Sequence, residues 1–116
     1  MCHALIIEDE WLIAEYLTVL AEEAGATSVA AAVTEDEAIS AAREQVPNII
    51  LSDVRLVDGT GPRAVQAITA DAGEVPVIFI TGTPEECRPC EPGVVILRKP
   101  IQPSTLVDTF RRLVAH

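Results

Sequence analysis

The chain has few aromatic residues and few basic residues, and it has no long apolar run. Only 3% of its 116 residues are aromatic, so its core has to be built from aliphatic side chains and alanine. Apolar residues make up 49% of the chain, yet no apolar run approaches the ~18 residues of a membrane-spanning helix. The beginning of the sequence also lacks the basic region and the cleavage site of a secretory signal. We therefore expect a cytoplasmic protein without a membrane segment.

The shortage of basic residues gives the chain a formal net charge of −10 at pH 7, because 18 Asp and Glu face 8 Lys and Arg. Duplex DNA repels such a surface, and no stretch rich in Lys or Arg provides phosphate contacts. We therefore expect no nucleic-acid partner, whereas a protein, a small ligand or a metal cation is compatible with the charge. Three cysteines, an odd number, fit a reducing compartment better than a disulfide framework.

The stretch Asn48–Asp53 predicts a buried strand that ends on a carboxylate, because apolar or small residues follow one another after the breaker Pro47. Three other apolar runs also end on polar side chains: residues 4–7 lead into Glu8 and Asp9, residues 77–80 into Thr81, and residues 94–97 into Arg98-Lys99-Pro100. If these strands are parallel, their ends meet at one edge of the sheet. That edge then carries carboxylates, a hydroxyl group and a lysine.

Helical patterns alternate with the strands. The remaining predicted elements are helices over residues 11–24, from Thr34 to about Gln45, over residues 62–72 and from Pro103 onward, with a weak edge strand over residues 27–33. Residues 83–93 contain three prolines and predict a loop with at most one or two helical turns. The apolar positions assigned to the core-facing sides of the first two helices include Leu12, Ile13, Tyr16, Leu17, Leu20, Ala38, Ile39, Ala42 and Val46.

This alternation of strand and helix, repeated five times with one degraded helix, predicts an α/β fold with a doubly wound parallel sheet. Right-handed crossovers and short connections favour the flavodoxin-like strand order 2-1-3-4-5. In that order the first and third strands are neighbours, and the topological switch point lies between them. Glu8, Asp9 and Asp53 are then expected to meet there, where open α/β sheets bind ligands.

Three carboxylates in one place need a partner. At an effective dielectric constant near 20, two such charges ~4 Å apart repel by roughly 4 kcal/mol, so the cluster has to hold protons, face water or bind a cation. Oxygen-only ligands favour Mg²⁺. Lys99 and the Thr81 hydroxyl beside this ion would form a receptacle for a phosphoryl group. Asp53, alone on its central strand, is the predicted nucleophile, which would form an acyl phosphate.

The sequence resembles the receiver domains of bacterial response regulators over nearly its whole length. The residues that carry the resemblance are Glu8-Asp9 after the first strand, Asp53-Val54-Arg55-Leu56, the Asp58-Gly59-Thr60-Gly61 turn, Thr81-Gly82 and Lys99-Pro100. Each motif alone is weak, but together, in this order and at these strand ends, they are specific. The resemblance implies one receiver domain over residues 1–116, without an output domain in this chain, that acts in two-component signalling and not as an enzyme.

The resemblance also implies a role for each side chain at the shared edge. Asp53 would receive a phosphoryl group from the phosphohistidine of a sensor histidine kinase or a histidine phosphotransferase. Thr81 and Lys99 would contact the phosphoryl oxygens, and the peptide bond between Lys99 and Pro100 would be cis. The implied Mg²⁺ ligands are Asp9 and Asp53 directly, Glu8 through water, and the backbone carbonyl of Arg55.

Two departures from the common receiver pattern affect the expected output. Ile96 stands where receivers usually carry Tyr or Phe, so no aromatic ring can swing inward after phosphorylation. We therefore expect phosphorylation to reorder residues 83–93 and remodel the face that this segment forms with the fifth strand and the last helix, where a downstream protein binds. Phe79-Ile80-Thr81-Gly82 is similar to the Phe-Ala-Thr-Gly motif of an alphaproteobacterial subgroup linked to general stress signalling, with Ile80 in place of alanine.

Other interpretations of the same residues remain open. The acidic edge can consist of unrelated helix caps, or belong to a degenerate receiver that binds partners without being phosphorylated. Asp58-Gly59-Thr60 is typical of the nucleophile motif of haloacid-dehalogenase-type phosphatases, but Leu56 stands where that motif needs a second aspartate. Cys87-Arg88-Pro89-Cys90 has the spacing of a redox pair or half a zinc site, which Cys2 and His3 would have to complete across two strand spacings. We expect loop cysteines without a cofactor.

Overall fold

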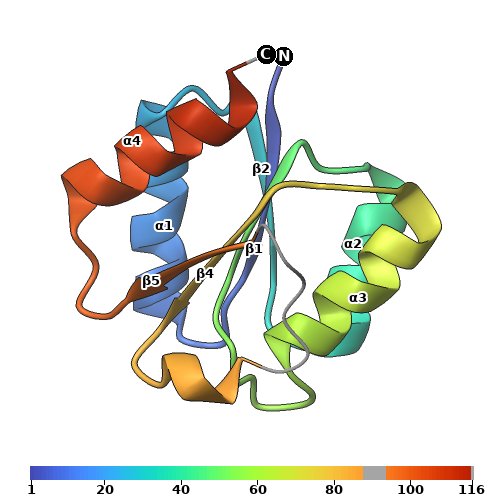
Figure 1. The fold of residues 1–116 in the computed structure, drawn as a ribbon. Coiled ribbons are helices and arrows are strands. Elements are labelled where there is room, and N and C mark those ends of the chain that lie inside the picture. Colours follow the sequence, from blue (N-terminus) through green and yellow to red (C-terminus); the bar gives the residue numbers. More distant parts are fainter. Residues whose placement is uncertain (88–93, 116) are drawn as a thin grey trace.

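Five parallel strands form the centre of the molecule, and helices cover both faces of the sheet (Figure 1). The computed structural model describes residues 1–87 and 94–115. The elements are β1 (His3–Ile7), α1 (Trp11–Glu23), β2 (Ser28–Ala32), α2 (Glu35–Glu44), β3 (Ile49–Ser52), α3 (Gly61–Ala72), β4 (Val77–Thr81), the 3₁₀ turn η1 (Pro84–Glu86), β5 (Val95–Arg98) and α4 (Pro103–Val114).

The strand order is β2-β1-β3-β4-β5, which confirms the predicted flavodoxin-like topology. Helices α1 and α4 lie on one side of the sheet, and α2 and α3 lie on the other (Figure 1). Ile7 at the end of β1 pairs with Ser52 at the end of β3, so the residues that follow these two strands emerge next to each other. In the described part of the chain, η1 is the only helical turn between β4 and β5, as the three prolines predicted.

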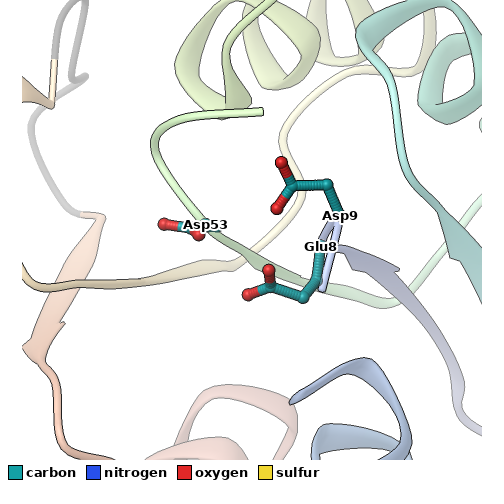
Figure 2. A group of neighbouring side chains, drawn as sticks. All are labelled: Glu8, Asp9 and Asp53. Carbon is teal, nitrogen blue, oxygen red and sulfur yellow. The ribbon is translucent and has the colours of Figure 1, made fainter. Parts of the chain in front are cut away.

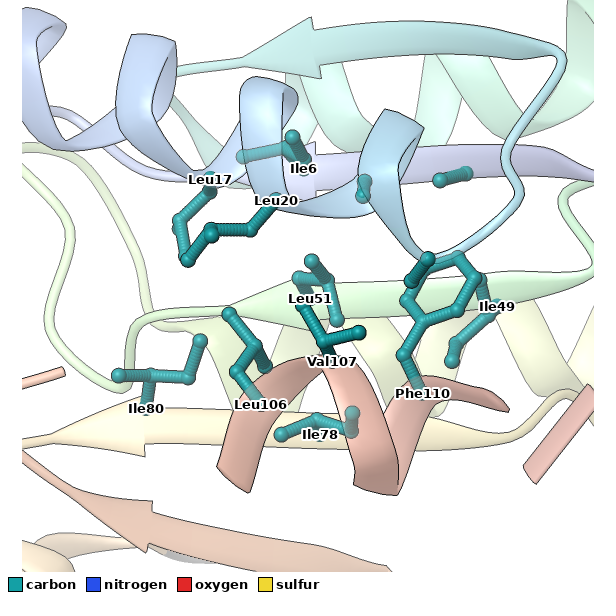
Figure 3. Packing of buried hydrophobic residues seen from close by; sticks show 13 residues of the cluster. Ile6, Leu17, Leu20, Ile49, Leu51, Ile78, Ile80, Leu106, Val107 and Phe110 are labelled. Carbon is teal, nitrogen blue, oxygen red and sulfur yellow. The ribbon is translucent and has the colours of Figure 1, made fainter. Parts of the chain in front are cut away.

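Alternate side chains of each central strand enter different cores, because successive side chains of a strand point to opposite faces. On β1, Ala4 and Ile6 join the cluster beneath α1 and α4, whereas Leu5 and Ile7 join the cluster beneath α2 and α3. Figure 3 shows side chains from α1, the strands and α4 meeting in the first of these clusters. A strand that is buried on both faces needs an unbroken apolar run, and this requirement explains the sequence pattern of β1, β3 and β4.

In the described residues, side-chain hydrogen bonds cap the starts of α2 and α3. Thr34 starts α2, and its hydroxyl oxygen accepts a hydrogen bond of 3.1 Å from the backbone N–H of Glu37. The Glu37 carboxylate accepts in return from the N–H of Val33, one residue before the position that a capping box would use. No helix in residues 1–87 and 94–115 is long and apolar enough to cross a membrane.

Three apolar residues assigned to core-facing positions are exposed instead. Leu12 and Tyr16 on α1 are 72% and 42% exposed, and Val46 is 54% exposed. The buried stripe of α1 centres on Leu17 and Leu20, and Leu12 lies about 140° around the helix from Leu17. Val46 lies outside because α2 ends at Glu44 and the next residue is already extended. The sequence pattern therefore gave these helices a wider apolar face than the sheet covers.

We expect Leu17→Ala to destabilise the fold by about 2–5 kcal/mol, because it leaves a cavity in the core. Leu12→Ala, the same change on the same helix, should cost less than about 0.5 kcal/mol because Leu12 faces solvent. Urea denaturation of both variants measures the two free energies of unfolding. Equal losses would show that the burial assigned to α1 is wrong.

Candidate metal centre

The carboxyl ends of β1 and β3 bring three carboxylates together (Figure 2). One carboxylate oxygen each from Glu8, Asp9 and Asp53 lies within 4.8 Å of the others. Glu8 is buried, whereas Asp9 and Asp53 are partly exposed at the mouth of the site. The structure thus places side by side the acidic residues that the strand ends predicted, from parts of the chain more than forty residues apart.

Hydrogen bonds fix the Asp53 carboxylate at the end of β3. The backbone N–H of Asp53 donates to the carbonyl of Ile7 at 2.9 Å, and this hydrogen bond ties Asp53 to the end of β1. The N–H of Val54 donates to Asp53 Oδ1 at 2.7 Å, and Asp53 Oδ2 lies 3.2 Å from Lys99 Nζ. One carboxylate oxygen of Asp53 is therefore held by the backbone, while the other faces the ammonium group of Lys99.

Lys99 supplies the positive charge at this edge. Its backbone N–H donates to the carbonyl of Thr81 at 2.9 Å, and its peptide bond with Pro100 is cis, as the sequence predicted. The ammonium group lies 3.2 Å from an oxygen of Asp53 and 3.8 Å from Glu8 Oε1. Burial lowers the pKa of Lys99, but the charges of Asp53 and Glu8 outweigh it and the net pKa is raised. Lys99 therefore stays protonated and partly neutralises the acidic group.

Glu8 is the buried carboxylate of the group. It is 2% exposed, and loss of hydration raises the pKa of its carboxyl to about 7, with a further increase from the charge of Asp53. A hydrogen bond of 3.0 Å from the backbone N–H of Glu10 and the charge of Lys99 lower the pKa again in part. The protein thus concentrates more negative charge at this edge than Lys99 balances.

The turn after Asp53 approaches the carboxylate site closely. A Cβ atom on Gly61 would collide with the carbonyl oxygen of Asp53 and with the side chain of Ser52. The N–H of Gly61 donates to the carbonyl of Val54 at 2.8 Å. Glycine is therefore required where α3 begins, because the chain passes directly over the end of β3.

Thr81 ends β4 as predicted, but its hydroxyl is occupied by a residue that sequence analysis did not single out. Thr81 Oγ1 accepts a hydrogen bond of 3.0 Å from the N–H of Thr83 and lies 3.3 Å from the Thr83 hydroxyl. A second unpredicted contact is the 2.7 Å ion pair between Arg55 and Glu86 of η1. Thr83 and the charge of Arg55 lower the pKa of Glu86. Arg55 and Glu86 are 31 residues apart, so no local pattern signalled this pair.

The other chemical interpretations gain little from the geometry. Asp58 lies in the turn before α3, and the described acidic group does not include it. Cys2 and His3 lie at the beginning of β1, whereas Cys87 follows η1 beyond the opposite end of the parallel sheet, so these residues do not assemble a zinc site. Cys2 is free, but Cys87 is disulfide-bonded, whereas the odd number of cysteines had favoured a reducing environment over a disulfide framework. Cys90 lies outside the described residues.

Comparison with known proteins identifies the family. The sequence profile described as response regulator receiver domain matches residues 4–111. The chain belongs to this family. A similar curated protein is the phyllosphere-induced regulator PhyR of Methylorubrum extorquens, which is 42% identical over 107 residues. That match covers 88% of this receiver domain and 39% of PhyR, so the chain spans about two fifths of the length of its relative.

Solved structures agree with the family and with the fold. The PhyR receiver domain of Erythrobacter litoralis has a TM-score of 0.89 at 32% identity, covering 98% of this chain and 90% of that one. The anti-anti-sigma factor PhyR of Bartonella quintana has a TM-score of 0.82 at 31% identity, covering 98% of this chain and 47% of that one. These similarities are consistent with the alphaproteobacterial stress-response subgroup that the Phe79–Gly82 motif indicated.

A magnesium-containing receiver domain shares the fold. The receiver domain of the sensor histidine kinase PA1611 from Pseudomonas aeruginosa, solved with a magnesium ion in its active-site cleft, has a TM-score of 0.85 at 24% identity. The alignment covers 99% of this chain and 98% of that one. In the present chain, Glu8, Asp9 and Asp53 offer only carboxylate oxygens, which is the donor set that a hard divalent cation prefers. The residues at this edge therefore fit Mg²⁺.

The raised pKa of Glu8 predicts how stability depends on pH without metal. Between its usual pKa of 4.5 and about 7, the unfolded chain loses this proton while the folded chain retains it. The free energy of unfolding should therefore fall as the pH rises through this window, and the penalty is complete above it. One pKa unit corresponds to about 1.4 kcal/mol, so the total is a few kcal/mol.

Glu8→Gln removes this titration, so its stability advantage over the native chain should grow from pH 5 to pH 8 in EDTA. Urea denaturation at several pH values measures the difference. Parallel pH profiles for the two proteins would show that Glu8 does not carry the penalty.

Proposed function

We propose that this receiver domain is a phosphorylation switch in the cytoplasm. Asp53 accepts a phosphoryl group from the phosphohistidine of a sensor histidine kinase or a histidine phosphotransferase, and the phosphorylated domain binds a downstream protein. The observation that carries the proposal is the position of Asp53 Oδ2, which lies 3.2 Å from Lys99 Nζ beside two further carboxylates. This arrangement provides a nucleophile, a cation and a candidate metal site at one sheet edge.

The proposed metal ligands are carboxylate oxygens of Asp9 and Asp53, Glu8 through water, and the backbone carbonyl of Arg55. When bound, Mg²⁺ would offset the negative charge that a phosphoryl group adds to an edge already rich in carboxylates. The burial of Glu8 supports this role, because a buried carboxylate with a raised pKa gains most from a cation.

In the proposed transfer, a carboxylate oxygen of Asp53 forms a bond to phosphorus while the bond between phosphorus and the donor imidazole nitrogen breaks. The released histidine keeps the electron pair of that bond and takes up a proton from solvent. Lys99 holds the developing phosphoryl charge, because its ammonium group already lies at this carboxylate. Thr81 donates its hydroxyl hydrogen to a phosphoryl oxygen after its contact with Thr83 is rearranged.

The contacts around η1 support a route by which the signal leaves the site. Thr83 binds Thr81, and Glu86 of η1 binds Arg55, so two ends of the same short segment are tied to residues next to the phosphoryl site. Movement of Thr81 would therefore shift η1 against β5, whose Ile96 is 39% exposed. The face formed by β4, η1, β5 and α4 is the proposed binding surface for the downstream protein; residues 88–93 lie outside the described part.

The similarity to PhyR proteins, one of which is titled an anti-anti-sigma factor, supports a protein as the downstream partner. The net charge of −10 supports the same conclusion against nucleic acid. A receiver that binds its partner without phosphorylation remains the second candidate, because the exposed Ile96 and η1 do not themselves require the modification. The two candidates differ in whether partner binding changes after Asp53 is modified.

Mg²⁺ should stabilise the native chain, because it relieves the repulsion among Glu8, Asp9 and Asp53. At ten times its dissociation constant, the gain is roughly 1.4 kcal/mol. Asp9→Asn should remove most of this gain, while Asp36→Asn, an equal change of charge at the exposed start of α2, should leave it intact. Thermal denaturation with MgCl₂ and with EDTA measures it. If the melting temperature of the native chain is the same with MgCl₂ and with EDTA, the metal site is disproved.

Asp53 should be the single phosphoacceptor. Acetyl phosphate with Mg²⁺ should add one labile phosphoryl group, visible as a gain of mass in intact-protein mass spectrometry, and Asp53→Ala should abolish it. Asp58→Ala serves as the control because Asp58 lies in the next turn and outside the acidic group. Undiminished labelling of the Asp53→Ala variant would refute the assignment.

A further inference from the structure

We propose that Glu35, at the start of α2, is a positioning residue for the metal site. The inference rests on the proposed function, because it concerns how the Arg55 carbonyl is held in place for Mg²⁺. Glu35 is 25 residues from Thr60 in the sequence and belongs to another element, yet it binds the turn that follows Asp53.

Glu35 grips this turn at both ends. Its backbone N–H donates to the carbonyl of Asp58 at 3.1 Å. Its carboxylate oxygen Oε2 accepts a hydrogen bond of 3.1 Å from the backbone N–H of Thr60. The side chain is only 21% exposed, so the second hydrogen bond is partly shielded from water. Together the two bonds fix the three-residue turn to the beginning of α2.

Gly59, between the two contact points, allows Glu35 to come this close. A Cβ atom on Gly59 would collide with the Glu35 side chain, and the φ angle of Gly59 is +86°, in the region that favours glycine. Space and backbone conformation thus both suit a turn that packs on this one carboxylate. The ion pair of Glu35 with Arg63 is long, at 3.8 Å, and Arg63 is 67% exposed, so it contributes little.

The turn at residues 58–60, which Glu35 binds, is paired with residues that follow Asp53 at the acidic site. Thr60 forms an isolated antiparallel bridge with Arg55, and the next N–H, of Gly61, donates to the carbonyl of Val54 at 2.8 Å. The backbone around Arg55 is therefore paired with the backbone around Thr60, and Thr60 is held by Glu35. Loss of the Glu35 oxygen would leave the N–H of Thr60 unpaired and loosen the backbone that presents the proposed fourth ligand.

The alternative role for Glu35 is purely structural, since an acidic residue in the first turn stabilises any helix through the helix dipole. Asp36 and Glu37 have the same property. A structural role predicts lower stability with unchanged metal affinity, whereas a positioning role predicts weaker metal binding. Groups that orient metal ligands typically change metal affinity about 10–100-fold when removed.

Four variants separate reach from charge. Glu35→Gln keeps the length and an acceptor oxygen for the Thr60 N–H but removes the charge, whereas Glu35→Asp keeps the charge and withdraws the oxygen by one methylene. Glu35→Ala removes both. Asp36→Ala is the matched control, because it removes an exposed charge from the same helical turn. Among the described residues, the Asp36 side chain forms no hydrogen bond that this change would break.

Isothermal titration with MgCl₂ gives the dissociation constant of each variant, and circular dichroism checks that each is folded. We expect Glu35→Ala and Glu35→Asp to bind Mg²⁺ about tenfold more weakly, and Glu35→Gln and Asp36→Ala to bind like the native chain. The fluorescence of Trp11, two residues after Asp9, provides an independent signal. The Gln and Asp variants decide the question by themselves if the Ala variant fails to fold.

Native affinity in Glu35→Asp would overturn the inference, because reach would then not matter. Equal weakening in Glu35→Gln and Glu35→Asp would overturn it as well, because keeping the acceptor oxygen at the Thr60 N–H would then give no advantage in metal binding. Weakening in Asp36→Ala to the same extent would assign the effect to the helix start. Absence of Mg²⁺ binding in the native chain would instead refute the metal site of the proposed function, which distinguishes the two failures.

Discussion

The crowding of negative charge at one sheet edge is the constraint on which the rest of the structure depends. Glu8 is almost fully buried there, and its raised pKa records the cost of placing a carboxylate beside Asp53 without water. Lys99 offsets part of this cost at 3.2 and 3.8 Å from the two acids. Such a cluster is stable only when the backbone holds each charge in place, and the surrounding turns provide that support.

The two cores provide a rigid base for the site. Because alternate residues of β1, β3 and β4 are buried in opposite clusters, none of these strands can slide by one residue without exchanging the side chains that fill the two clusters. The ends of β1 and β3 are therefore fixed relative to each other. Beyond these ends the chain relies on single contacts, such as Glu35 with Thr60 and Arg55 with Glu86. The two buried clusters thus stabilise the strands that carry the site, whereas the loops around the site are held by fewer contacts.

The family relationship explains the fold and the acidic edge, whereas the proposed binding surface departs from the common receiver pattern at Ile96. Ile96 on β5 is aliphatic and 39% exposed, so it offers a contact surface without a ring that could change position. The short turn η1 replaces a full helix between β4 and β5 in the described residues, and it is tied to the site through Thr83 and Glu86. A change at Asp53 would therefore act first on this turn.

The sequence by itself determined the parallel α/β fold, the strand order and the residues that meet at the acidic edge. Strand ends are marked by local signals, since an apolar run that stops at Asp53 or Lys99 needs no distant information to be recognised. Even the cis bond before Pro100 followed from a family motif, and the structure contains it. In this part of the chain the local sequence pattern and the fold agree, because the pairing of the strands alone decides which strand ends lie side by side.

Only the tertiary structure decided which contacts support that edge. Leu12 has the periodicity of a core residue, but the position of α1 on the sheet leaves it in solvent. Glu35 looks like one of several acids at a helix start, and its contact with Thr60 exists because α2 packs beside the turn before α3. Such contacts depend on how whole elements pack and where loops pass. A one-dimensional pattern carries no record of these distances, so they become visible only once the chain is folded.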